Sequence, residues 1–146
     1  MASGFGKDLE YVGGQSAALF QRHIFKRKGE VYYDFNVPPE FRSSYFEKYI
    51  KFDPTLIGYN LASVGEPIST ADVMPYDVFT QSRFYKEWAV PQGLVDSVGV
   101  VLERTATTAA IIGIMRSEMA DEASIRSMRL VSPHARRAVQ IGTLLD

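Results

Sequence analysis

Residues able to perform catalysis or to bind a metal are few and scattered in this sequence. The two histidines, His23 and His134, have no second ligand at metal-binding spacing. The lack of cysteine excludes thiolate metal sites, disulfides and a cysteine nucleophile. The stretch GFGK at residues 4–7 lacks the spacing of a phosphate-binding loop, and the chain contains no G-x-S-x-G nucleophile motif. We therefore expect no enzymatic activity, no cofactor and no metal site.

Aromatic residues are more informative, because they are concentrated in one part of the chain. Of the 18 Phe, Trp and Tyr residues, 14 lie between Tyr32 and Trp88, and none follows Trp88. Such rings can simply pack helices onto a sheet, or they can line an apolar pocket in which a few polar groups orient a small ligand. The residue types alone leave both interpretations open.

The pocket interpretation depends on a helix predicted over residues 38–52. Its aromatic residues recur at steps of three and four and share one face: Phe41, Tyr45, Tyr49 and Phe52. Asp53 follows and could orient a ligand, and it could equally cap the short helix that Pro54 opens. A further helix predicted over residues 76–90 places Tyr85 and Trp88 on one face, where they could line a cavity or support the fold.

The remaining pattern predicts an α+β domain. A short helix over residues 5–12 precedes two strands, over residues 15–25 and 31–36, that form a hairpin. A short strand is predicted at 67–70, and two long strands at 97–104 and 107–117 form a second hairpin. We expect Arg116, at the end of the last strand, to lie at the surface. This order indicates a single PAS-like domain with one antiparallel sheet of about five strands flanked by helices.

The end of the chain predicts two successive helices. The first, over residues 121–131, is capped by Asp121, and a new helix begins at Ser132 and Pro133. An apolar stripe follows at helical spacing and is suited to a connector or a dimer contact. It consists of Ala135, Ala138, Ile141, Leu144 and Leu145.

Size and charge narrow the class of protein. The 146 residues fit one domain with a hydrophobic core, and the formal net charge of -1 gives no overall field that would attract nucleic acid. The start of the chain lacks a signal-peptide pattern, and no apolar run reaches the roughly 18 residues of a membrane span. We therefore expect a cytoplasmic protein that contacts neither membranes nor, by itself, DNA.

Several of these motifs together resemble a known family. The segment PPEFRSSYFEKYIKFDP resembles the part of LuxR-type autoinducer-binding domains that lines the acyl-homoserine lactone pocket, with Phe41, Tyr45 and the pair Asp53 and Pro54 matching in type. The stretches GGQSAALF, SRFYKEWAVPQGLVDSVGVVLER and LVSPHARRAV extend a likeness to sensor regions of LuxR-type helix-turn-helix regulators over nearly the whole chain.

This resemblance implies a sensor domain over residues 1–132 and a connector or dimerisation helix over residues 133–146 that leads to a helix-turn-helix domain missing from this sequence. The implied partners are a small apolar or amphipathic ligand, a second copy of the chain, and DNA only through the missing domain. The ligand-binding residues would be Phe41, Tyr45, Tyr49, Asp53, Tyr85 and Trp88. A domain for dimerisation or protein interaction, with a filled aromatic core and no ligand, is the alternative.

Overall fold

The computed structural model describes residues 13–26 and 28–145, with side chains as far as residue 140. The helix predicted over residues 5–12 lies outside the described residues. No helix in the described ranges is long and apolar enough to cross a membrane.

Five strands form one antiparallel sheet, as the sequence predicts. They are β1 (Ser16–His23), β2 (Gly29–Phe35), β3 (Ile68–Ser69), β4 (Asp96–Arg104) and β5 (Thr108–Arg116). Their order across the sheet is β2-β1-β5-β4-β3, and every neighbouring pair is antiparallel. Strand β5 is apolar on both faces because it lies in the centre of the sheet, with a layer of helices against each face.

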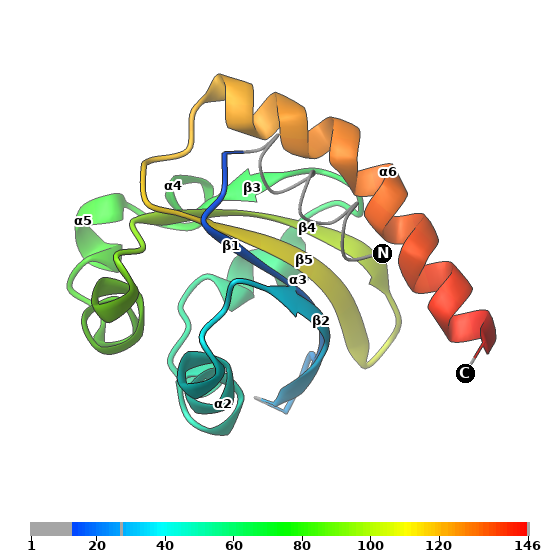
Figure 1. The fold of residues 1–146 in the computed structure, drawn as a ribbon, viewed down its shortest axis with the longest axis horizontal. Helices are drawn as coiled ribbons and strands as arrows, with labels where there is room; N and C mark the ends of the chain where they lie inside the picture. The colour runs from blue at the N-terminus through cyan, green and yellow to red at the C-terminus, as the bar shows by residue number, and fades with distance from the viewer. Residues whose placement is uncertain (1–12, 27, 146) are drawn as a thin grey trace.

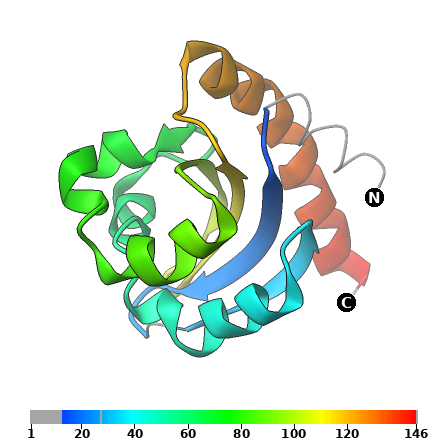
Figure 2. The same ribbon diagram turned by 60° about the vertical axis from the view of Figure 1, so that its left-hand side comes forward.

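The alternating side chains of these strands create two separate cores. One face packs against α6 (Glu122–Leu145) through residues such as Val100, Ile112 and Met128. The other face packs against the aromatic segments through Phe20, Val101 and Ile111. Figure 2 shows the curved sheet wrapping around the short helices of the aromatic segments, with α6 on the outer face of the sheet. The sheet therefore separates α6 from the aromatic layer.

The aromatic layer consists of short helical pieces. They are α2 (Pro39–Glu47), a 3₁₀ turn (Tyr49–Lys51), α3 (Leu56–Leu61), α4 (Thr70–Val73), α5 (Tyr76–Phe79), a π-helical turn (Tyr85–Ala89) and a 3₁₀ turn (Val90–Gln92) (Figure 1). The single helix predicted over residues 76–90 is wrong. The Ser82 hydroxyl donates to the Phe79 carbonyl (2.6 Å) and accepts the amide of Tyr85 (3.1 Å), so it ends one helical turn and begins another.

The C-terminal helix begins where the sequence predicts and then differs from the prediction. Asp121 caps it, since its carboxylate accepts the amide of Ser124 at 2.7 Å. A new helix start at Ser132 and Pro133 is wrong, because α6 continues through Pro133. Proline cannot donate to the carbonyl of Arg129, four residues earlier, and the Ser132 hydroxyl donates to that carbonyl instead (3.3 Å). The Ser132 hydroxyl thus replaces the hydrogen bond that the Arg129 carbonyl lacks because Pro133 has no backbone N–H.

The described part of the apolar stripe, Ala135 and Ala138, faces its own domain. Ala135 is buried in the core cluster beside Val131 and Val139, against the sheet, and Ala138 is half-buried. The side chains of Ile141, Leu144 and Leu145 lie outside the described residues. The part of the stripe that the structure describes therefore serves to cover the sheet.

Arg116 corrects another expectation. It is buried, with 5% of its surface exposed, and donates to the carbonyls of Gly13 (3.1 Å) and Met119 (3.4 Å). Its cross-strand neighbour is Asp96. The hydrogen bonds to these two backbone carbonyls offset part of the cost of burying the charge.

Candidate functional site

A cavity of about 100 Å³ lies between the sheet and the aromatic layer. The sheet contributes Ala18, Phe20, Gly113 and Met115 to its wall. The opposite wall includes Tyr45, Phe46, Leu56, Tyr59, Phe84 and Trp88. These aromatic and aliphatic surfaces are typical of pockets that hold small apolar ligands.

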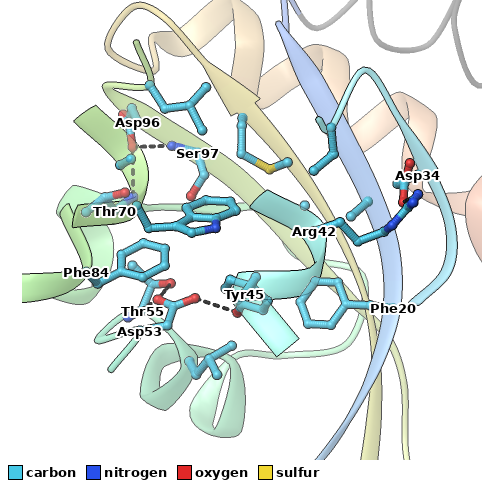
Figure 3. A pocket seen from close by; sticks show the side chains of 18 of the residues that line it. Phe20, Asp34, Arg42, Tyr45, Asp53, Thr55, Thr70, Phe84, Asp96 and Ser97 are labelled. Atoms are coloured by element: carbon cyan, nitrogen blue, oxygen red, sulfur yellow. Dashed lines mark hydrogen bonds and ion pairs between the residues drawn. The ribbon is translucent and has the colours of Figure 1, made fainter. Parts of the chain in front are cut away.

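A carboxyl group with several hydrogen bonds is set into this apolar wall. The Tyr45 hydroxyl donates to Asp53 Oδ2 at 2.7 Å, and Asp53 Oδ1 accepts both the amide (3.0 Å) and the hydroxyl (2.6 Å) of Thr55 (Figure 3). Burial raises the pKa of Asp53, while these hydrogen bonds and the charge of Arg22 lower it in part. Burial, followed by the neighbouring Asp53, also raises the pKa of Tyr45 well above its ordinary value. Asp53 thus supports the turn before α3 and faces the cavity.

Trp88 forms a second fixed part of the wall. Its indole N–H donates to the carbonyl of Phe41 at 2.9 Å. The ring stacks on Phe84, with 5.2 Å between centroids, and lies 5.2 Å from the ring of Tyr45. The side chain is thereby held in one orientation at the edge of the cavity.

The structure brings Tyr45, Asp53 and Trp88 together on the cavity wall, and it places the other three predicted residues elsewhere. Phe41 packs edge-on against Trp88 and does not line the cavity. Tyr49 donates its hydroxyl to the exposed Glu87 (2.9 Å), and Tyr85 packs against Phe79.

A second polar group, absent from the sequence-based set, lies at one end of the cavity. Asp96 is 5% exposed and accepts the backbone amides of Thr70 (3.2 Å), Ser97 (2.7 Å) and Ala120 (2.8 Å). Thr70 is 1% exposed, and its hydroxyl has no hydrogen-bond partner among the residues that the structure describes. The sequence contains one signal for the position of Thr70. Ser69 and Asp72 have the spacing of a capping box, and they form one at the start of α4, where Thr70 lies.

The opposite end of the cavity carries an ion pair. Arg42 of α2 lies 2.8 Å from Asp34 of β2, and the arginine side chain is 40% exposed. Figure 3 shows this pair on the far side of the cavity from Thr70 and Asp96. The cavity therefore has a buried polar end and a charged end that reaches solvent.

Gly113 forms part of the sheet side of the cavity, and Gly99 lies beside it under Tyr59, which forms part of the opposite wall. Gly99 and Gly113 are cross-strand partners in β4 and β5. A Cβ atom at Gly99 would collide with the Tyr59 hydroxyl, whereas one at Gly113 would meet only Phe20 Cε1, at 3.9 Å. Gly113 therefore leaves space that a side chain could fill, and a glycine inside an apolar strand is the sequence signal for it.

The described part of the chain contains no group of three or more His, Asp or Glu residues placed to hold a metal ion.

Comparison with known proteins gives a match at the level of structure alone. No family model and no curated protein matches the chain. The ligand-binding domain of VqsR from Pseudomonas aeruginosa is similar, with a TM-score of 0.70 at 13% sequence identity over 93% of each chain. CepR2 of Burkholderia cenocepacia, described as an N-acylhomoserine lactone dependent LuxR family transcription factor, gives 0.65 at 17% identity over 94% of this chain and 82% of its own.

Escherichia coli SdiA is a third similar structure. Its TM-score is 0.61 at 17% identity, and the match covers 95% of this chain and 60% of the SdiA chain. SdiA has also been solved in complex with octanoyl-rac-glycerol. With its five-stranded antiparallel sheet and helices on both faces, the chain has the α+β fold of the ligand-binding domains of LuxR-type regulators.

Proposed function

We propose that this chain is the ligand-sensing domain of a LuxR-type transcription regulator. It binds a small apolar or amphipathic molecule and passes the signal to a C-terminal DNA-binding domain. The observation that carries this proposal is the cavity with aromatic walls, into which Asp53 presents a carboxyl oriented by Tyr45 and Thr55. An apolar enclosure with a few fixed polar groups binds the chain of an amphiphile and orients its head.

The similar structures support the class of ligand. CepR2 is described as dependent on N-acylhomoserine lactone, and SdiA has been solved with octanoyl-rac-glycerol. Both molecules join an acyl chain to an uncharged head that is rich in oxygen. We extend this shared chemistry to the present cavity.

The size of the cavity bears on how the signal would arise. Its volume of about 100 Å³ is below the roughly 300 Å³ at which drug-sized ligand pockets begin. We therefore propose that an acyl chain enters by displacing wall side chains, so that the ligand binds an expanded conformation better than the compact one. This difference in affinity is what shifts a population between two states.

A ligand screen tests the proposal. The chain is heated with N-octanoyl homoserine lactone, octanoyl-rac-glycerol or octanoate, and complexes are detected by native mass spectrometry. Binding to the folded state raises the melting temperature by mass action. We expect a concentration-dependent increase with at least one neutral amphiphile, and no shift and no complex with any of them would reject the sensing function.

The same small volume favours a second candidate, a dimerisation or interaction domain without a ligand. This candidate predicts no thermal shift in the screen together with a concentration-dependent dimer in sedimentation velocity. The homodimer, the cytoplasmic location and the division of the chain at residue 132 stay predictions from the sequence.

A further inference from the structure

We infer that Thr70 is a ligand-binding residue of this cavity, and that its hydroxyl forms a hydrogen bond with an uncharged oxygen of the ligand's head group. The inference rests on the proposed sensing function and goes beyond it by naming a residue and the chemical group that it recognises. It starts from the isolation of the hydroxyl. Thr70 lines the cavity and is 1% exposed, and the described residues offer its Oγ1 no partner.

An unpartnered buried hydroxyl is unfavourable, because it loses its hydrogen bonds to water on folding without replacing them. The surrounding contacts nevertheless hold this residue firmly in place. Its backbone amide donates to Asp96 Oδ1 (3.2 Å), and the Ser69 and Asp72 capping box fixes the turn in which it stands. Threonine is also restricted at χ1. The hydroxyl is therefore held in position, and a ligand atom in the cavity could supply its missing partner.

Charge on the cavity wall indicates which kind of ligand atom this is. The wall carries the carboxyl groups of Asp53 and Asp96. Burial, followed by the charges of Asp53 and Asp96, raises the pKa of Tyr59, which lines the same cavity. Arg42, the cation among the described wall residues, is already paired with Asp34 at the opposite end. An anionic head beside Thr70 would be repelled, whereas an ester, amide or hydroxyl oxygen would not.

The test uses Trp88, the single tryptophan of the chain, which lines the same cavity. Its fluorescence is followed while octanoyl-rac-glycerol, N-octanoyl homoserine lactone or octanoate is added to the 146-residue chain. Two substitutions separate the hydroxyl from the shape of the side chain. Thr70→Val removes the hydroxyl and keeps the volume, and Thr70→Ser keeps the hydroxyl. The control is Thr107→Val, an exposed position in the turn between β4 and β5.

Thr70→Val is expected to weaken binding of one or both neutral probes by roughly 3- to 10-fold, the value of one neutral hydrogen bond. Thr70→Ser and Thr107→Val should keep most of the wild-type affinity. The neutral probe whose affinity falls shows which head group, the glyceryl ester or the lactone amide, contacts Thr70. Octanoate should bind more weakly than either neutral probe.

A second readout separates this role from a structural one. Removing an unpartnered hydroxyl should leave the melting temperature of the protein without probe unchanged or raise it, so that affinity and stability move in opposite directions. Unchanged affinity of Thr70→Val for both neutral probes would overturn the inference alone, leaving an ordered water as the hydroxyl's partner. Octanoate binding as tightly as the neutral probes would also overturn it. Failure of the wild-type protein to bind any probe would overturn the proposed function as well.

Discussion

Asp53 accepts three hydrogen bonds, one from Tyr45 and two from Thr55. Burial raises its pKa more than these bonds lower it. The carboxyl is therefore costly to ionise and rigidly held, a combination typical of functional sites. Its immediate partners should control both the stability of the domain and the pH dependence of that stability.

Tyr45→Phe removes the hydroxyl that donates to Asp53. We expect the free energy of unfolding to fall by about 1–2 kcal/mol, because a buried charged acceptor loses one of its donors. Urea denaturation at neutral pH measures the change. Tyr49→Phe is the matched control, since its hydroxyl binds the exposed Glu87, and it should have little effect. An equal fall in the free energy of unfolding of the two variants would contradict this prediction. It would show that the buried hydrogen bond to Asp53 stabilises the domain no more than the exposed one to Glu87.

The raised pKa of Asp53 predicts how its contribution varies with pH. The folded protein binds this proton more tightly than the unfolded chain does, so protonation of Asp53 favours folding. As pH rises from the ordinary value of 3.8 through the higher native pKa, Asp53 progressively lowers the free energy of unfolding. Asp53→Asn lacks this contribution. We subtract the free energy of unfolding of the wild type from that of the variant at each pH. This difference should increase with pH across the same window. A difference that stays constant or falls would contradict a raised native pKa of Asp53.

Local rules predict only part of this residue set. The helical spacing of Tyr45 and Tyr49 implies one shared face, but α2 ends at Glu47 and Lys48 leaves the helical conformation (φ -134°). Tyr49 is therefore turned away from the cavity. Thr70 and Asp96, 26 positions apart in the sequence, meet because β3 and β4 pair beside α4, and only the folded sheet shows that contact.

At the scale of elements, α6 remains one helix although it contains Pro133. Its core-facing residues, including Met128 and Val131, hold the helix on the sheet on both sides of Pro133. This packing outweighs the local signal of Ser132 and Pro133, which alone indicates a helix start. The apolar pattern also does not predict the break at Ser82, because this break depends on hydrogen bonds of the Ser82 hydroxyl rather than on apolar spacing.

Pro133→Ala should stabilise the domain by about 1–3 kcal/mol, because it restores the amide that the Arg129 carbonyl lacks. Ser132→Ala should destabilise the wild type more than it destabilises the Pro133→Ala variant. A double-mutant cycle in thermal denaturation measures this coupling. If Pro133→Ala lowers stability, or if the two effects simply add, Pro133 is acting as the first residue of a separate helix.

The strand pattern is the part of the fold that the sequence predicts best. Continuous apolar runs define the central hairpin, because residues 98–102 of β4 and 109–114 of β5 are all buried, as expected of strands covered on both faces. The curvature of the sheet and the size of the cavity depend on how particular side chains meet. One such case is the Tyr59 hydroxyl that requires glycine at position 99.

At the scale of the whole molecule, the sheet lies between the cavity and α6, and Asp96 links the two sides. Its carboxylate binds the amide of Thr70 on the cavity wall and that of Ala120, one residue before the Asp121 cap of α6. Asp96 therefore joins the start of α4, on the cavity wall, to the segment that leads into α6.

The most direct test of the central claim fills the cavity from the sheet. Gly113→Val places a β-branched side chain, favoured in strands, where the nearest neighbour of an added Cβ is 3.9 Å away. We predict that Gly113→Val folds with nearly wild-type stability. Its affinity for octanoyl-rac-glycerol and N-octanoyl homoserine lactone, measured by Trp88 fluorescence, should fall by at least about 10-fold. The control, Ala106→Val in the exposed turn between β4 and β5, should bind both probes with wild-type affinity. A well-folded Gly113→Val protein that binds the probes with wild-type affinity would contradict the account, because the ligand would then occupy another place.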